Sequence, residues 1–160
     1  MIETHDYCSK FQDDFLIVYR ACLAHYQIDP ATSVQEERVA NLLNSGRHMS
    51  CLMAYDGAEP AGFATWSLTL PAGSGIALYM KEMFVVKTAR GKGAGRKLFA
   101  GLLDRAEREG CIRMDWQTDR SNPLSQAFYT QAGAPKFDKQ TYRVMADDFS
   151  NFKTTLTSLC

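Results

Sequence analysis

One stretch of this chain constrains its fold more than any other: residues 78–109 combine an apolar run, a glycine-rich turn and an amphipathic pattern. The run LYMKEMFVV is typical of a strand and RGKGAG of a turn, and the segment RKLFAGLLDRAERE predicts a helix with Leu98, Leu102, Leu103 and Ala106 on its inner face. In such a unit the backbone N–H groups of the turn and of the helix start point the same way. They can bind a phosphate group, helped by the positive end of the helix dipole.

The spacing of the glycines decides which phosphate loop this is. A Walker A loop, G-x-x-x-x-G-K-[ST], is absent. A dinucleotide fingerprint, G-x-G-x-x-G, begins at Gly91 and Gly93 but meets Arg96 where its third glycine belongs, which weakens a nucleotide-binding alternative. The pattern R-x-x-G-x-G fits at Arg90, Gly93 and Gly95, and glycines without a Cβ let a ligand approach the backbone. This loop resembles the coenzyme A pyrophosphate loop of the GNAT superfamily of N-acetyltransferases.

Composition excludes several other classes of protein. Lys plus Arg and Asp plus Glu number 18 each, so no net charge points to nucleic acid or to a membrane surface. The five cysteines are widely spaced and lack a C-x-x-C pair, which favours reduced thiols in a cytosolic protein over a disulfide framework or a zinc site. The three histidines show no metal-binding spacing, and no apolar run has transmembrane length. We therefore expect a cytoplasmic protein that binds no metal, nucleic acid or membrane.

The order of the elements predicts an α/β (α+β) fold. Periodicity and turn signals indicate helices over residues 9–27, 33–44, 96–109 and 122–133, and strands over 1–5, 50–55, 61–70, 78–86 and 111–116, with a closing strand pair at Phe137 and 141–145. Ser33 followed by Glu36 suggests a capping box for the second helix. We expect a mixed sheet of about six to seven strands with helices on both faces. The crossover helix makes the strands at 78–86 and 111–116 parallel neighbours.

A second block extends the resemblance to roughly residues 50–145. The run NPLSQAFYTQAGA (122–134) is similar to the family's N-x-x-x-x-x-FY-x-x-x-G helix, and TYRV (141–144) to its closing strand. The form LYMKEMFVV most resembles the branch that acetylates small amines, including diamines and polyamines. The resemblance implies one acetyl-CoA-binding acyltransferase domain over 1–160, with acceptor-side helices at 1–49, a cofactor core at 50–146 and a tail at 147–160. Because relatives often form dimers, the resemblance also makes a homodimer possible.

The same resemblance assigns the cofactor-binding residues. The pyrophosphate would lie on the loop formed by Arg90, Gly91, Lys92, Gly93, Ala94, Gly95 and Arg96; the alternative is a plain strand-to-helix turn with solvated basic residues. The pantetheine arm would bond to the backbone of Met83, Phe84 and Val85 in the gap between two splayed strands, although their side chains also suit an ordinary core. The N–H of Val85 would stabilise the oxyanion by about 3–4 kcal/mol. Asn122 matches a position near the cofactor arm, and helix N-capping is its competing role.

Two residues are assigned to proton transfer. Tyr129 matches the general acid; the ordinary pKa of a tyrosine, about 10, against about 8.5 for a thiol, makes full transfer uphill by roughly 2 kcal/mol. A core tyrosine on an amphipathic helix is the alternative.

For the base, the branch has two adjacent acids where this chain has Lys81-Glu82, so the acid usually credited with the role is missing. Glu82 through water, a carboxylate from another segment, and no dedicated base remain open, because neighbouring strand residues face opposite ways unless a bulge intervenes.

These assignments imply an enzymatic function, and one alternative function remains open. The chain is expected to transfer an acetyl group from acetyl-CoA to a primary amine of a small molecule by direct attack, without an acyl-enzyme. Lys81 suggests the further hypothesis that the acceptor carries a carboxylate, as an amino acid does. The rival is a non-catalytic acyl-CoA-binding module on the same fold. The lost acid at Lys81 favours the module, and the retained Tyr129 argues against it.

Overall fold

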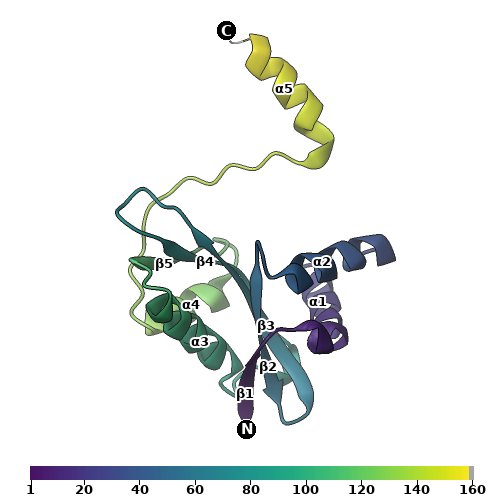
Figure 1. The fold of residues 1–160 in the computed structure, drawn as a ribbon, viewed down its shortest axis with the longest axis vertical. Helices are drawn as coiled ribbons and strands as arrows, with labels where there is room; N and C mark the ends of the chain where they lie inside the picture. Colours follow the sequence, from purple (N-terminus) through teal and green to yellow (C-terminus); the bar gives the residue numbers. More distant parts are fainter. Residues whose placement is uncertain (159–160) are drawn as a thin grey trace. The chain divides into compact units, whose positions relative to one another are not determined.

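The computed structural model describes residues 1–158; Leu159 and Cys160, the end of the expected tail, lie outside the described residues. Contacts divide the chain into two compact units, Met1–Gln117 and Thr118–Cys160. The first unit carries the sheet and its helices, and the second carries a helix, an extended stretch and a C-terminal helix (Figure 1). The single domain expected over 1–160 stays a prediction.

The sheet has five strands in the order in which they occur along the chain. The strands are β1 (Ile2–Asp6), β2 (Ser50–Asp56), β3 (Glu59–Thr69), β4 (Ala77–Val85) and β5 (Arg113–Trp116). Neighbours are antiparallel from β1 to β4, and β4 pairs with β5 in parallel. The mixed sheet and its parallel pair are confirmed.

The expectation of six to seven strands is wrong. In the described part of the chain no strand follows Trp116, and the expected strand pair at Phe137 and 141–145 is absent. Phe137 is 78% exposed, Tyr142 86% and Met145 61%. The alternation of TYRV suits a strand, but these three side chains are mostly exposed and, within residues 1–158, the stretch has no neighbouring strand to pair with.

Helices cover both faces of the sheet, as expected (Figure 1). On one face, α1 (Gln12–His25) and α2 (Ser33–Ser45) bury a core formed by residues that include Phe15, Val18, Leu43, Met53, Phe63 and Phe84. On the other face lies α3 (Ala94–Arg108), whose Leu98 and Leu102 are fully buried. Gly101 lets α3 approach the sheet closely, since a Cβ there would lie 2.7 Å from the Leu52 side chain.

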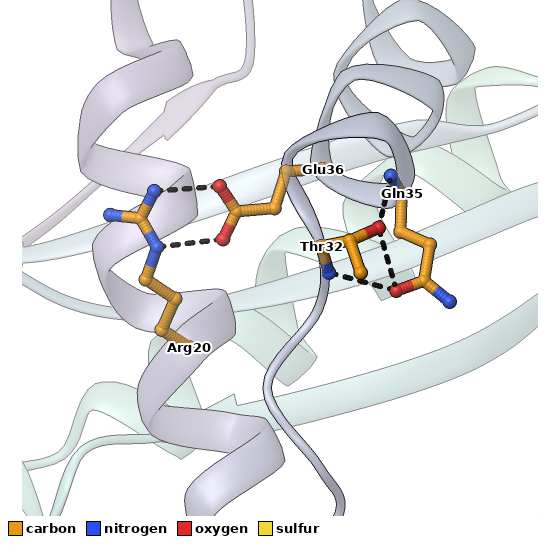
Figure 2. Close-up of polar contacts among 4 residues, drawn as sticks. All are labelled: Arg20, Thr32, Gln35 and Glu36. Atoms are coloured by element: carbon orange, nitrogen blue, oxygen red, sulfur yellow. Dashed lines mark hydrogen bonds and ion pairs between the residues drawn. The ribbon is translucent and has the colours of Figure 1, made fainter.

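The start of α2 differs by one residue from the expectation. Thr32, not Ser33, is the N-cap: its Oγ1 accepts the N–H of Gln35 at 3.3 Å, and Gln35 Oε1 accepts the N–H of Thr32 at 2.8 Å. The Glu36 carboxylate instead accepts hydrogen bonds from Nε and Nη2 of Arg20, each at 2.7 Å (Figure 2). The capping box is therefore present one position earlier, and Glu36 is used to join α1 to α2.

The second unit contains α4 (Pro123–Gln131) and α5 (Phe149–Ser158), with a 3-10 turn at Ala146–Asp148 before α5. The tail expected at 147–160 is thus helical as far as it is described. Along residues 1–158, no helix combines the length and the apolar character needed to cross a bilayer.

Candidate active site

The glycine-rich loop presents an array of backbone donors. Gly91 (φ 78°) and Gly93 (φ 93°) adopt left-handed conformations that favour glycine, and Gly93 is the N-cap of α3. Lys97 is the first residue whose N–H joins the helix, to the Gly93 carbonyl at 3.0 Å. Within residues 1–158, no hydrogen bond uses the N–H groups of the preceding Gly91, Gly93, Ala94, Gly95 and Arg96. Such an array can hold a diphosphate.

The side-chain charges of the loop are used unequally. Lys92 Nζ binds Asp56 Oδ2 at 2.8 Å, and this hydrogen bond is the main reason why the pKa of Asp56 is lowered. Arg90 Nε donates to the Val85 carbonyl at 3.1 Å. The Arg96 side chain is exposed and makes no hydrogen bond or ion pair with another residue of the described chain. Arg96 is therefore the loop cation best able to meet an anionic ligand.

The C-terminal half of β4 has an open edge. β5 pairs with β4 only from Ala77 to Met80, whereas β4 continues to Val85. On the other side of β4, Val86 N–H donates to the Ala61 carbonyl at 3.0 Å. Because antiparallel pairing alternates along a strand, the N–H and C=O of Val85, and those of Met83, point away from β3. They face the side on which β5 has stopped; Arg90 already donates to the Val85 carbonyl, so the N–H of Val85 and both backbone groups of Met83 are the ones that an extended arm can pair with.

A β-bulge lies next to this open edge. Thr65 pairs with Glu82, but its neighbour Trp66 pairs with Met80, so Lys81 is an extra residue in β4. The bulge turns Glu82 to the face that carries Phe63, Phe84 and α1. Without it, Glu82 would share the face of Met80, which α3 covers. A bulge was the condition under which Glu82 could take the place of the acid that Lys81 replaces, and the structure has that bulge.

Glu82 lies against the C-terminal end of α1. The hydroxyl of Tyr26 donates to Glu82 Oε1 at 3.4 Å. Burial, and next the negative charge of Glu82, raise the pKa of Tyr26 to about 12, and the same two causes raise the pKa of the Cys22 thiol to about 12. Both groups are therefore protonated at neutral pH, so Tyr26 serves as a hydrogen-bond donor to the carboxylate.

Arg90 contacts both the C-terminal end of α1 and the C-terminal end of β4. Besides the Val85 carbonyl, its guanidinium contacts His25 Nε2 at 3.4 Å and lies over the Phe84 ring, 5.9 Å from the centroid. A guanidinium only donates, so His25 Nε2 can take part in this contact only as the acceptor. Sequence reasoning missed His25 and Tyr26 because their role depends on where α1 meets β4. The one local signal was that they end a helix just before the Asp29-Pro30 break.

Two predicted site residues belong to the second unit. Asn122 Oδ1 accepts the N–H of Ser125 at 3.1 Å, so its N-capping role in α4 is confirmed. Tyr129 is half-buried on α4, where its ring packs edge-to-face on Phe128 with centroids 5.1 Å apart. Their roles toward the cofactor and the leaving thiol stay predictions. Among residues 1–158, no group of three or more His, Cys, Asp or Glu side chains is placed to hold a metal ion.

Known structures share this fold. An integron cassette protein from the mobile metagenome of V. cholerae is 28% identical with a TM-score of 0.82, covering 95% of this chain and 97% of that one. An aminoglycoside N-acetyltransferase in complex with CoA is 14% identical with a TM-score of 0.77, covering 91% of this chain and 95% of that one. The second likeness shows the fold alone.

Sequence comparison is more specific. The D-amino-acid N-acetyltransferase HPA3 of Saccharomyces cerevisiae is 39% identical over 66 residues. That match spans 41% of this chain and 40% of the yeast enzyme's length. The sequence model of the Acetyltransferase (GNAT) family matches residues 10–134, which is most of the chain and includes the loop, the bulged strand and α4. The chain therefore belongs to the acetyltransferase (GNAT) family.

Proposed function

We propose that this protein is an acetyl-CoA-dependent N-acetyltransferase that acetylates a primary amine of a small molecule by direct attack. One observation carries the proposal: within one unit, loop amides without a hydrogen-bond partner in residues 1–158 occur together with an open β4 edge and with Glu82, which directly follows the bulge. A diphosphate fits the first feature and a peptide-like pantetheine arm fits the second. The yeast relative, named as an N-acetyltransferase, supports the same chemistry.

Each part of the site has a defined task. When bound, acetyl-CoA would supply the acetyl thioester whose carbonyl carbon the amine attacks. The amides of Gly91 and of residues 93–96 would bind its diphosphate, and the N–H of Val85 would donate to the carbonyl oxygen as negative charge develops there. Asn122 is proposed to lie near the cofactor arm, and Met83 and Phe84 to contribute to the strand that receives it.

Proton transfer balances the reaction. The new bond joins the amine nitrogen to the acetyl carbon, and the bond to sulfur breaks. Glu82, through a water molecule, would take the proton that the nitrogen loses. Tyr129 would give a proton to the departing thiolate, after which solvent exchange restores both groups. No covalent acyl-enzyme is formed, and no metal is required.

Lys81 suggests an acceptor that also carries a carboxylate. As the extra residue of the bulge it is exposed, and its ammonium group has no partner in the described chain. A zwitterionic amino acid would offer its amine to Glu82 and its carboxylate to Lys81. The name of the yeast relative, a D-amino-acid N-acetyltransferase, is consistent with this hypothesis.

Replacing Lys81 with glutamate should reverse the preference between the two kinds of acceptor. We expect kcat/KM to fall about tenfold for amino acids and to rise or stay level for diamines, because the nearby charge changes sign. Competition between an amino acid and a diamine, measured by product ratio, checks this directly. Lys87→Glu, an equal charge change on the exposed turn after β4, is the matched control. An unchanged ranking of acceptors in Lys81→Glu contradicts the hypothesis.

The function itself is tested by thiol release from acetyl-CoA with a panel of amino acids, diamines, polyamines and aminoglycosides. We expect turnover with at least one member and no release without an amine. The second candidate, a non-catalytic acyl-CoA-binding module, is favoured by Lys81 in place of the usual acid. Tight CoA binding without turnover for any amine would support that module instead.

The setting of the protein is also proposed. The four described cysteines, Cys8, Cys22, Cys51 and Cys111, are free thiols, which suits a cytoplasmic enzyme. We expect the small-molecule amine as its main partner, with a homodimer as the form to test by light scattering.

A further inference from the structure

We infer that Tyr26 is a positioning residue for Glu82, which makes the C-terminal end of α1 one wall of the acceptor-amine site. This inference rests on the proposed function, because it takes Glu82 as the base. Its foundation is the hydrogen bond from the Tyr26 hydroxyl to Glu82 Oε1, at 3.4 Å. The two residues are far apart in the sequence and meet only through the packing of α1 on the sheet.

The bulge makes this contact possible. The extra residue Lys81 moves Glu82 out of the alternation set by Met80 and onto the face that α1 covers. Tyr26 follows the last turn of α1 and is 42% exposed, so its ring reaches the boundary between core and solvent. A small amine arriving from solvent would therefore meet Tyr26 and Glu82 together.

The surrounding charges fit a donor role for Tyr26. From α1, the buried Cys22 thiol faces Glu82 but is protonated at neutral pH. Arg90, on the loop after β4, also acts on Tyr26, but its guanidinium is held by the Val85 carbonyl and by His25. Lys81 is the neighbour of Glu82 in β4. A neutral hydroxyl that donates to the carboxylate favours its charged form and fixes its orientation.

Orientation matters because a general base acts only within hydrogen-bond reach of the proton it accepts. Removing the hydroxyl should leave the carboxylate easier to protonate and less well aimed. The variant Tyr26→Phe keeps the ring and its packing against His25, where the centroids are 5.1 Å apart. The fold should therefore persist, and the effect should appear in the pH profile rather than in stability.

The test compares pH profiles of kcat/KM with acetyl-CoA and the best acceptor from the amine panel. In Tyr26→Phe we expect the acid limb to move up by about half a pH unit, giving about threefold lower activity on the acid side. The titration of the amine is common to all variants and does not contribute to the difference. Glu82→Gln should lose the contribution of the carboxylate and keep only the acid limb that the amine sets. Tyr19→Phe, a hydroxyl deletion on the same helix, should superimpose on the wild type.

The outcomes distinguish a failure of the Tyr26 inference from a failure of the proposed function. An acid limb in Tyr26→Phe that coincides with the wild type overturns the inference, as does an equal shift in Tyr19→Phe. A Glu82→Gln profile with the same acid limb as the wild type shows that Glu82 is not the base and overturns the inference too. A wild-type protein that binds CoA but acetylates no amine instead contradicts the proposed function itself.

Discussion

Replacing Tyr129 with phenylalanine should lower kcat by about 100-fold or more, while the affinity for CoA changes little. A general acid typically contributes 10²- to 10⁴-fold, and the substitution removes only the hydroxyl that would protonate the departing thiolate. The ring keeps its edge-to-face packing on Phe128 in α4. The loss should therefore appear in single-turnover thiol release, with the melting temperature almost unchanged.

The matched control is Tyr142→Phe, in the same unit of the chain. Tyr142 is 86% exposed, and its hydroxyl donates to Gln140 at 2.6 Å, so its loss should leave turnover within about twofold of the wild type. If Tyr129→Phe keeps more than a third of the wild-type kcat, Tyr129 is a structural residue and another group protonates the thiolate. If Tyr129→Phe and Tyr142→Phe both lose CoA binding, the substitutions disturb the structure of the second unit as a whole, and the loss of turnover does not report on an acid.

Periodicity and turn chemistry predicted the parts of the fold that local sequence determines. The helices expected over 33–44 and 96–109 and the parallel pair formed by β4 and β5 were predicted, and Gly46 and Gly110, both with positive φ, follow the ends of α2 and α3. Each depends on a backbone conformation that glycine favours or on a crossover long enough to return to the sheet. Such features need no knowledge of distant contacts.

The features that were missed depend on tertiary contacts. The expected strands at Phe137 and 141–145 have the alternation of strands but no ladder partner, and alternation alone cannot reveal that. The bulge at Lys81 is set by the pairing of β4 with β3, and the contact of Tyr26 with Glu82 by the packing of α1. The candidate site was thus predictable where it is backbone and loop, and not where it is built from side chains of separate elements.

Replacing Arg96 with glutamine should weaken CoA binding by about tenfold or more. Arg96 is in the first turn of α3, beside amides that no described group bonds, and it is the loop cation left available by the engagement of Arg90 and Lys92. Charge-assisted hydrogen bonds to a diphosphate contribute about 1.5–3 kcal/mol each, which is the size of the expected loss. Titration calorimetry with CoA measures it.

The neighbouring residue provides the control. Lys97→Gln makes the same change in net charge one position further along α3, on a different side of the helix, and should alter CoA affinity less than threefold. A cation in a first helical turn opposes the helix dipole by about 0.3–1 kcal/mol, and this first turn holds no acidic residue. Arg96→Gln should therefore keep or slightly raise the melting temperature while it loses affinity.

Salt dependence gives the last distinction. If Arg96 contacts the diphosphate directly, added salt should weaken CoA binding to the wild type and to Lys97→Gln in parallel, and weaken binding to Arg96→Gln less steeply. Equal losses of affinity in both variants would mean that the loop attracts CoA only through its overall charge. Ligand binding would then not explain why Arg96 stands in the first turn of α3, where its charge interacts unfavourably with the helix dipole. The diphosphate would have to lie elsewhere than on this first turn.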